Sequence, residues 1–199
     1  PVVLKELQKL CDSVEPIADE VAMEMLRNEW AVDDLNEVAT DIRLVASASL
    51  GQVYKARLKK TGEEVAIKVQ RPGMLQSFSL DLYLLQQIGA VLDALFTTIS
   101  HQAAYHEALF DSFSQGSYSE LDYEKEAANQ LLFQRELGNR RVKVKVPNVY
   151  LELTTQHVLT TEWIDGVKLA DSSQERIRQL IPDGVELFLT QLLDIGYFH

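Results

Sequence analysis

Short stretches in which apolar and polar residues alternate occur both early and late in the chain. Successive side chains of a strand point to opposite faces of a sheet, so this alternation predicts strands with one buried face. The clearest case is residues 65–70, where Val65, Ile67 and Val69 alternate with Ala66 and Lys68. Strands are predicted at residues 42–46, 52–58, 65–70 and 157–162, with a turn at 60–63 and shorter strand-like runs at 144–146 and 149–153.

Apolar residues recur every three or four positions on either side of these strands, which is the spacing of one helix face. Pro16 suits the first turn of such a helix, Ser117 or Ser119 can cap another, and Gly138 is expected to end it. Helices are predicted at residues 16–30, 80–96, 103–113, 120–137 and 183–195, with a short helix or turn at 33–38 and a break at 115–117. Because helices and strands come in blocks, the order predicts an α+β fold with an antiparallel sheet.

The chain of 199 residues has a formal net charge of −11, and 46% of its residues are apolar. This balance is typical of a globular protein, but an acidic chain is a poor candidate for binding nucleic acid through bulk electrostatics. Cys11 is the one cysteine, which excludes an intrachain disulfide and a cysteine-based metal site. The apolar run at 84–99 falls short of the ~20 residues of a membrane span, so we expect a packed helix there. The chain does not begin with Met, and we expect a fragment.

Lys68 is the first candidate for chemistry. Its neighbours Ile67 and Val69 are expected to face the core, so Lys68 and Ala66 face the other side of the sheet. A lysine on a central strand beneath a loop can reach the phosphates of a nucleotide. The sequence Val-Ala-Ile-Lys also fits an ordinary amphipathic edge strand, so both interpretations stay open on this segment alone.

The loop between the first two predicted strands is the second candidate. Kinases have the sequence G-x-G-x-x-G-x-V there, because glycine lets the backbone come close to phosphate. In this chain Gly51 is followed two residues later by Val53, but alanine and serine replace the other glycines, and their Cβ atoms stiffen the loop. Taken alone, the loop is better explained as a turn of small residues. Its residues are Ala46, Ser47, Ala48, Ser49, Leu50, Gly51, Gln52 and Val53.

The long predicted helix carries the third candidate, Glu126. Its spacing places it in one stripe with Asp122, Asn129 and Phe133. A carboxylate at the border of a buried face can reach a lysine on a neighbouring strand, so we predict an ion pair between Glu126 and Lys68. The alternative is a solvated acidic face. An adjacent and largely apolar stripe, expected to be buried, consists of Leu121, Ala128, Leu132 and Arg135.

Three segments taken together resemble the UbiB/ABC1 (ADCK) family of atypical kinases. They are the loop at 46–53, the sequence Lys-Val-Gln-Arg-Pro-Gly at 68–73, and the sequence Glu-x-Asp-x-x-x-Glu-Ala-x-Asn at 120–129. The resemblance covers about residues 12–199, and the final Gly-Tyr-Phe-His is similar to the family's lead-in to its catalytic loop. Ser47 is a mild departure, since the family loop usually reads Ala-Ala-Ala-Ser.

The resemblance implies a kinase-like N-lobe in residues 41–163, with an antiparallel sheet and a long regulatory helix. It also implies an N-terminal helical extension at 1–40 and the start of a truncated C-lobe at 164–199. Between the third strand and the regulatory helix, a helical insert at 74–114 is expected to pack against the lobe and the extension.

For the site, the resemblance implies that Lys68 and Glu126 form the catalytic ion pair and that the loop at 46–53 covers the nucleotide phosphates. The segment that ends the strand at 157–162 resembles the kinase hinge. Thr161 would be its gatekeeper residue, and backbone groups of Glu162 and Ile164 would bind adenine.

Glu120 and Asp122 match the family's Glu-x-Asp motif. This motif meets a Lys-x-Gly-Gln motif, which is expected to lie before Pro1. The segment Asp194-Ile195-Gly196 resembles a metal-binding Asp-Phe-Gly only superficially, because it precedes any catalytic loop. No metal site is expected within this chain, and the Mg²⁺ ligands are expected beyond His199.

The family's activity implies ATP and Mg²⁺ as cofactors, with ATPase or small-molecule kinase chemistry in isoprenoid quinone or lipid metabolism. The expected location is mitochondrial, plastid or bacterial, with peripheral membrane association, isoprenoid lipids or quinone-biosynthesis proteins as partners, and no nucleic acid. Two alternatives stay open: a catalytically inactive pseudokinase that works as a nucleotide-gated lipid-binding or interaction module, and an unrelated α+β domain. The chain on its own is expected not to catalyse phosphoryl transfer.

Overall fold

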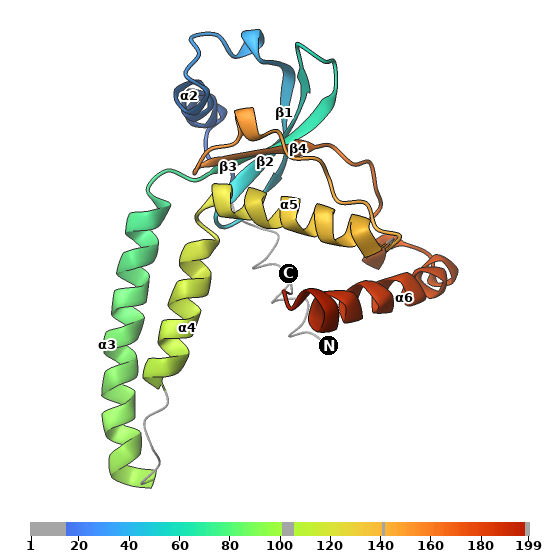
Figure 1. The fold of residues 1–199 in the computed structure, drawn as a ribbon. Coiled ribbons are helices and arrows are strands. Elements are labelled where there is room, and N and C mark those ends of the chain that lie inside the picture. Colours follow the sequence, from blue (N-terminus) through green and yellow to red (C-terminus); the bar gives the residue numbers. More distant parts are fainter. Residues whose placement is uncertain (1–14, 101–105, 141, 198–199) are drawn as a thin grey trace.

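The computed structural model describes residues 15–100, 106–140 and 142–197. One antiparallel sheet has the strand order β1-β2-β3-β4, and helix α5 lies across one of its faces (Figure 1). The strands are β1 (Ala39–Ser47), β2 (Gly51–Leu58), β3 (Glu64–Gln70) and β4 (Val158–Glu162). The helices are α2 (Asp19–Trp30), α3 (Met74–Ser100), α4 (His106–Ser119), α5 (Tyr123–Arg140) and α6 (Gln174–Leu189). The predicted α+β fold with an antiparallel sheet is confirmed.

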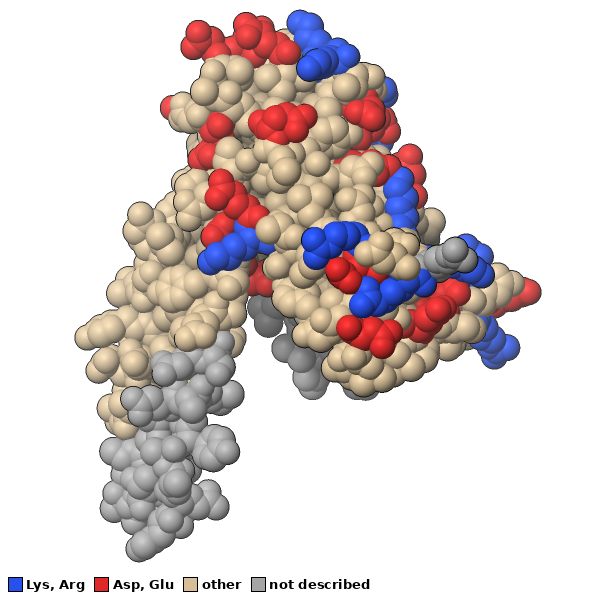
Figure 2. Space-filling view, viewed as in Figure 1, with Lys and Arg blue, Asp and Glu red and all other residues tan. Residues whose placement is uncertain are grey.

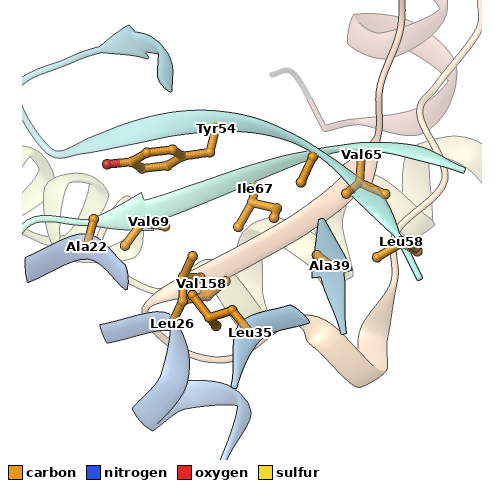
Figure 3. Packing of buried hydrophobic residues seen from close by; sticks show 11 residues of the cluster. Ala22, Leu26, Leu35, Ala39, Tyr54, Leu58, Val65, Ile67, Val69 and Val158 are labelled. Atoms are coloured by element: carbon orange, nitrogen blue, oxygen red, sulfur yellow. The ribbon is translucent and has the colours of Figure 1, made fainter. Parts of the chain in front are cut away.

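The core of the lobe lies on the face of the sheet that is turned toward α2 (Figure 3). Val65, Ile67 and Val69 of β3 are fully buried there, as the alternation in the sequence predicts. α2 supplies Ala22 and Leu26, which are also fully buried. Burying side chains of this size contributes roughly 1.5–3 kcal/mol each, so this cluster holds α2 on the sheet and leaves the opposite face free for other contacts.

α5 covers the opposite face, but with a different stripe from the one predicted. The helix buries Tyr123, Ala127, Phe133 and Leu137, whereas Ala128 and Arg135 of the predicted apolar stripe are exposed. The prediction was right for Leu121, which is buried just before the helix, and wrong for Ala128 and Arg135. Contact with the sheet sets the rotation of the helix, and Tyr123 and Ala127 pack there against Leu159 of β4.

The ends of α5 also differ from the prediction. Asp122 caps the helix, since its Oδ1 accepts a hydrogen bond from the Lys125 N–H (3.2 Å), in place of the expected Ser117 or Ser119. α5 therefore begins at Tyr123, and it continues past Gly138 to Arg140.

α3 and α4 form an antiparallel arm that projects away from the sheet (Figure 1). The two helices contact each other through the rings of Phe78 and Tyr118, whose centroids are 5.8 Å apart. Among the described residues, the arm does not lie along the lobe as expected, and the expected break at 115–117 lies inside α4. The expected contact with the extension falls partly on residues 1–14, outside the described residues. Figure 2 shows few charged side chains on the visible face of the arm. α3 exposes several large apolar side chains, namely Leu75, Leu80, Tyr83, Leu84, Leu85, Ile88 and Val91.

The segments around β4 and α6 correct three further predictions. Residues 144–146 form no strand, and the run at 149–153 contains a 3-10 turn at Leu151–Leu153. α6 begins at Gln174 rather than 183, because the Ser173 hydroxyl caps it by accepting a hydrogen bond from the Arg176 N–H (3.2 Å). Pro182 lies inside α6, and a π-helical turn at Thr190–Ile195 follows. Among the described residues, no helix is long and apolar enough to cross a membrane.

Candidate functional site

The ion pair predicted between Lys68 and Glu126 is present on the sheet face that α5 covers. The Lys68 Nζ lies 2.7 Å from Glu126 Oε2 and 3.0 Å from Oε1. The Lys68 side chain is 32% exposed and that of Glu126 is 29% exposed, so neither charge is fully removed from water. The Nζ also lies 4.5 Å from the centroid of the Tyr123 ring, which favours a cation at this place. These contacts fix the lysine ammonium between β3 and α5.

The register of the sheet decides which candidate residues share the face of Lys68. Val53 pairs with Lys68 in β3, and Ala46 pairs with Val53 in β1. Paired residues direct their side chains to the same face, so these three side chains form one row. Thr161 pairs with Ala66 in the next row. The structure therefore brings together small and apolar side chains around the lysine, on strands that are far apart in sequence.

Ser47 and Gln52 belong to the opposite face. They pair with each other, and Gln52 pairs with Val69 of the core. Gln52 is fully buried, and its Nε2 donates to the Tyr54 hydroxyl (2.7 Å). The side chains of Ser47 and Gln52 thus point away from Lys68, so only their backbone groups are available on the lysine side.

Gly51 has a tight environment at the start of β2. A Cβ atom at this position would lie 2.5 Å from the Val69 carbonyl oxygen and 2.8 Å from the Tyr123 hydroxyl oxygen. Cβ atoms essentially never come so close to other heavy atoms, so a side chain here would force the strands or α5 to move. The glycine is required by the approach of Tyr123 and β3, in addition to any approach of a phosphate.

The remaining loop residues form a short turn. The Ala48 N–H donates to the Gly51 carbonyl (2.8 Å), so Ser49 and Leu50 lie at the tip between β1 and β2. The Leu50 carbonyl accepts a hydrogen bond from the Arg71 N–H (2.9 Å), which ties the tip to the end of β3.

Tyr123 lies beneath this loop as the first residue of α5. Its ring is fully buried, and its hydroxyl has no hydrogen-bond partner among the described residues. Burial raises the pKa of the Tyr123 hydroxyl well above its usual range, and the negative charges of Glu126 and Glu120 raise it further. A buried hydroxyl without a partner is unusual, and it lies between the loop and the ammonium of Lys68.

The expected hinge segment starts with the last two residues of β4, Thr161 and Glu162, and continues beyond the strand. The Glu162 N–H donates to the Asn148 carbonyl (2.8 Å), so this donor is already engaged. The Glu162 carboxylate pairs with Lys145 and accepts from the Asn148 N–H (3.3 Å), and the hydrogen bond from Lys145 is the main cause that lowers the pKa of this carboxyl. Ile164 is 39% exposed. Glu162 can therefore contribute its carbonyl, and no longer its N–H, to a ligand.

Glu120 and Asp122 lie at the start of α5 but have different neighbours. Asp122 caps the helix, and its other carboxylate oxygen lies 3.4 Å from Lys125 Nζ. Glu120 lines a cavity of about 310 Å³ together with Glu126. This open cavity is lined mainly by α5, the segment 144–147 and residues of α6 and the turn that follows it. The two carboxylates of the predicted motif are thus not directed at one common partner among the described residues.

A family model for the ABC1 atypical kinase-like domain matches residues 9–199. The chain belongs to this family. The resemblance drawn from the sequence motifs is therefore confirmed, and the fold is that of a kinase-like N-lobe.

Named relatives of this ABC1 domain come from a plant and a cyanobacterium. An uncharacterized chloroplastic aarF domain-containing protein kinase of Arabidopsis thaliana is 36% identical over 100% of this chain and 28% of its own length. The chloroplastic Protein ACTIVITY OF BC1 COMPLEX KINASE 3 of the same plant is 34% identical over 100% of this chain and 28% of its own length. An uncharacterized protein of Synechocystis sp. is 38% identical over 98% of this chain and 35% of its length. The chain thus spans only 28% to 35% of these relatives.

Two residues of the site in this ABC1 domain, Lys55 and Tyr123, and one residue behind the loop, Arg71, escaped the sequence reasoning. Lys55 lies on the same face as Val53, 2.7 Å from Glu64 and 4.7 Å from the centroid of the Trp163 ring. Lys55 lies two residues after Val53 in β2, so the alternation of side chains along the strand could have identified Lys55 from the sequence. Tyr123 and Arg71 could not have been found in this way, because their contacts join segments that only folding brings together. Among the described residues, no group of three or more potential metal ligands is present.

Proposed function

We propose that this ABC1 domain is the ATP-binding lobe of an atypical kinase or ATPase. The observation that carries the proposal is the ion pair between Lys68 and Glu126, which holds an ammonium on the sheet face next to the loop at 46–53. In kinases, a strand lysine held by a helix glutamate binds nucleotide phosphates. Lys68 and Glu126 would be the catalytic-site pair of the whole protein, and the loop would cover the phosphates.

The residues around Lys68 fit a nucleotide. Ala66 and Val53 present a small apolar surface for a purine ring, and Thr161, next to Ala66, would be the gatekeeper residue. The Tyr123 hydroxyl lacks a partner among the described residues, so a phosphate oxygen that reached it would gain a hydrogen bond. When bound, Mg²⁺ and ATP would supply the metal charge and the phosphoryl group, and we expect the Mg²⁺ ligands beyond His199. The carbonyl of Glu162 and the backbone of Ile164 would bind the adenine edge.

The substrate and setting belong to the whole protein, of which this chain matches a part. We propose ATPase or small-molecule kinase activity linked to isoprenoid quinone or lipid metabolism. Two of the relatives described above are chloroplastic and one is cyanobacterial, which favours a plastid or a bacterium over a mitochondrion. Peripheral association with a membrane, and contact of Glu120 and Asp122 with a Lys-x-Gly-Gln motif that precedes this chain, form part of the proposal.

A catalytically inactive pseudokinase is the second candidate. One observation favours it: the Tyr123 hydroxyl oxygen occupies the space beside Gly51 and would lie only 2.8 Å from a Cβ there. A loop whose underside is already occupied leaves less room for a triphosphate. Such a protein would bind nucleotide or lipid as a signal without phosphoryl transfer.

Binding and turnover of Mg·ATP by the full-length protein test both candidates. Lys68→Met and Glu126→Gln are expected to weaken binding about tenfold or more, because each leaves its partner without a counter-charge. The matched control is Lys125→Met, which removes an exposed lysine beside Glu126 on α5.

Turnover that disappears in Lys68→Met supports the enzyme, and binding without turnover supports the pseudokinase. A full-length protein that binds no nucleotide contradicts both. Turnover by residues 1–199 alone would contradict the placement of the metal ligands beyond His199.

A further inference from the structure

Arg71 connects three parts of the chain that are distant in sequence. It directly follows β3, and its Nε donates to the Ala48 carbonyl (3.0 Å). One of its Nη atoms donates to the Ser47 hydroxyl (2.9 Å) and to the Glu15 carbonyl (2.6 Å). With the bond from its N–H to the Leu50 carbonyl (2.9 Å), this one residue is bonded to both sides of the loop and to the segment before α2.

These contacts lie on the face of the sheet away from Lys68. Ser47 pairs with Gln52, whose side chain is buried on the core side. On the same side, the Gln52 Oε1 accepts a hydrogen bond from the Ile17 N–H (2.5 Å). The guanidinium of Arg71 therefore holds the loop from the core-side face of the sheet, where it would not touch a nucleotide bound on the lysine side.

The Ser47 hydroxyl supplies one of the contacts that Arg71 makes with the loop. An alanine has no oxygen to accept the hydrogen bond from Arg71, so the serine adds a tether. Hydrogen bonds in which one partner is charged are stronger than neutral ones. A guanidinium can make several such bonds at once because its donors are arranged in a rigid plane.

We propose that Arg71 is a positioning residue that holds the loop at 46–53 closed over the nucleotide and couples it to the segment 15–17. This inference rests on the proposed function of the domain as a nucleotide-binding lobe. A loop that is ordered before the nucleotide arrives loses less conformational entropy on binding, so the tethers increase affinity. Because the same guanidinium binds the Glu15 carbonyl, a displacement of the segment before α2 would also loosen the loop.

The test uses the full-length protein and compares Arg71→Gln with two further variants of the same contacts. Hydrogen exchange of the loop amides is measured without nucleotide, and the Kd for Mg·ATP and the turnover at saturating Mg·ATP are measured separately. Arg71→Gln is expected to speed exchange in residues 47–51 about tenfold and to raise the Kd about tenfold, which is about 1.4 kcal/mol, with turnover changed less than twofold. Ser47→Ala removes one tether and is expected to raise both quantities about two- to threefold. Arg71→Lys keeps the charge and is expected to fall between the wild type and Arg71→Gln.

The control is Arg57→Gln, at the other end of β2. Arg57 donates to the Gly62 carbonyl (2.8 Å) and to Glu64 (3.1 Å), so the substitution also removes two arginine contacts from the sheet but none from the loop. It is expected to change neither loop exchange nor the Kd.

Several outcomes would overturn the proposal. Loop exchange and a Kd in Arg71→Gln equal to those of Arg57→Gln would show that the guanidinium does not hold the loop. Faster exchange spread evenly over the whole lobe would show a general structural role instead. If Arg71→Gln fails to fold, Ser47→Ala still decides, because unchanged loop exchange there contradicts the tether. A wild-type protein that binds no nucleotide overturns this proposal together with the proposed function, whereas binding that is unaffected by Arg71→Gln overturns this proposal alone.

Discussion

Replacement of Gly51 by alanine is expected to destabilise the lobe even when no nucleotide is present. The new Cβ would lie 2.5 Å from the Val69 carbonyl oxygen and 2.8 Å from the Tyr123 hydroxyl oxygen. The first of these atoms belongs to the backbone of the neighbouring strand, so the clash cannot be relieved by a side-chain rotation. Overpacking of this kind typically costs about 1–3 kcal/mol, and in a chain of this size that corresponds to a decrease of about 2–12 °C in the melting temperature.

Gly138→Ala is a matched control in which the same added methyl group is expected to raise the melting temperature instead of lowering it. Gly138 lies within α5, and a Cβ there would meet no atom within 4 Å. Alanine is favoured over glycine inside a helix by about 0.5–1 kcal/mol, so this variant is expected to melt about 1–4 °C higher. Both variants add one methyl group, so only the surroundings differ.

Thermal unfolding followed by circular dichroism measures the two shifts. In the background of Tyr123→Phe, the 2.8 Å contact of Gly51→Ala disappears but the 2.5 Å contact remains, so only part of the loss should be recovered. If Gly51 served only the approach of a phosphate, Gly51→Ala would melt within about a degree of the wild type in the absence of nucleotide. That result would refute the close-packing explanation.

Three further predictions concern charged and buried polar groups. The free energies of unfolding of the wild type, Lys68→Met, Glu126→Gln and the double variant, measured by chemical denaturation, form a double-mutant cycle. Because the ion pair is partly exposed, the cycle is expected to give a coupling energy of about 1 kcal/mol. Additive effects of the two substitutions on the free energy of unfolding would contradict this prediction. Tyr123→Phe should stabilise the nucleotide-free lobe by about 1 kcal/mol, because it removes a buried hydroxyl without a partner among the described residues; a loss of stability would reveal a partner. Burial, with the hydrogen bond to Asp19, raises the pKa of Tyr54 to about 12 from 10. The neutral phenol is thus favoured by folding, and this stability is complete below pH 10 and lost as the pH rises from 10 to 12. Tyr54 contributes on the order of 2 kcal/mol to this loss, so Tyr54→Phe should lose less stability than the wild type when unfolding is measured across this range; equal losses in the two proteins would contradict the prediction.

Local pattern was sufficient for the elements whose buried face repeats with a clear period. Residues 65–70 were predicted almost to the residue as β3. The buried side chains Val65, Ile67 and Val69 occupy every second position, and this period of two is itself the signature of a strand with one buried face. The ends of α5 and α6 were not predicted well. Helix ends depend on single capping contacts, such as those of Asp122 and Ser173, and several residues near each end are chemically able to form them.

The arm of α3 and α4 shows a second limit of local pattern. The sequence predicts helices here, and helices form, but it does not say what the helices pack against. In the part of the chain that the structure describes, the arm projects away from the sheet. Periodicity could not have shown this, since it reports which side of a helix is apolar and not which surface lies next to it.

The sequence by itself determined the α+β class, the family, and the pairing of Lys68 with Glu126, because these depend on motifs in which residue type and spacing carry the chemistry. Only the tertiary structure decided the orientation of the loop. The strand register directs Ser47 to the core-side face that α2 covers, away from Lys68. Tertiary packing also places the Tyr123 hydroxyl beside Gly51, and brings Arg71 to the loop and to the segment before α2. The reason is physical: the face of a side chain changes with a shift of one residue in register, and contacts between distant segments exist only after the sheet and α5 have packed together.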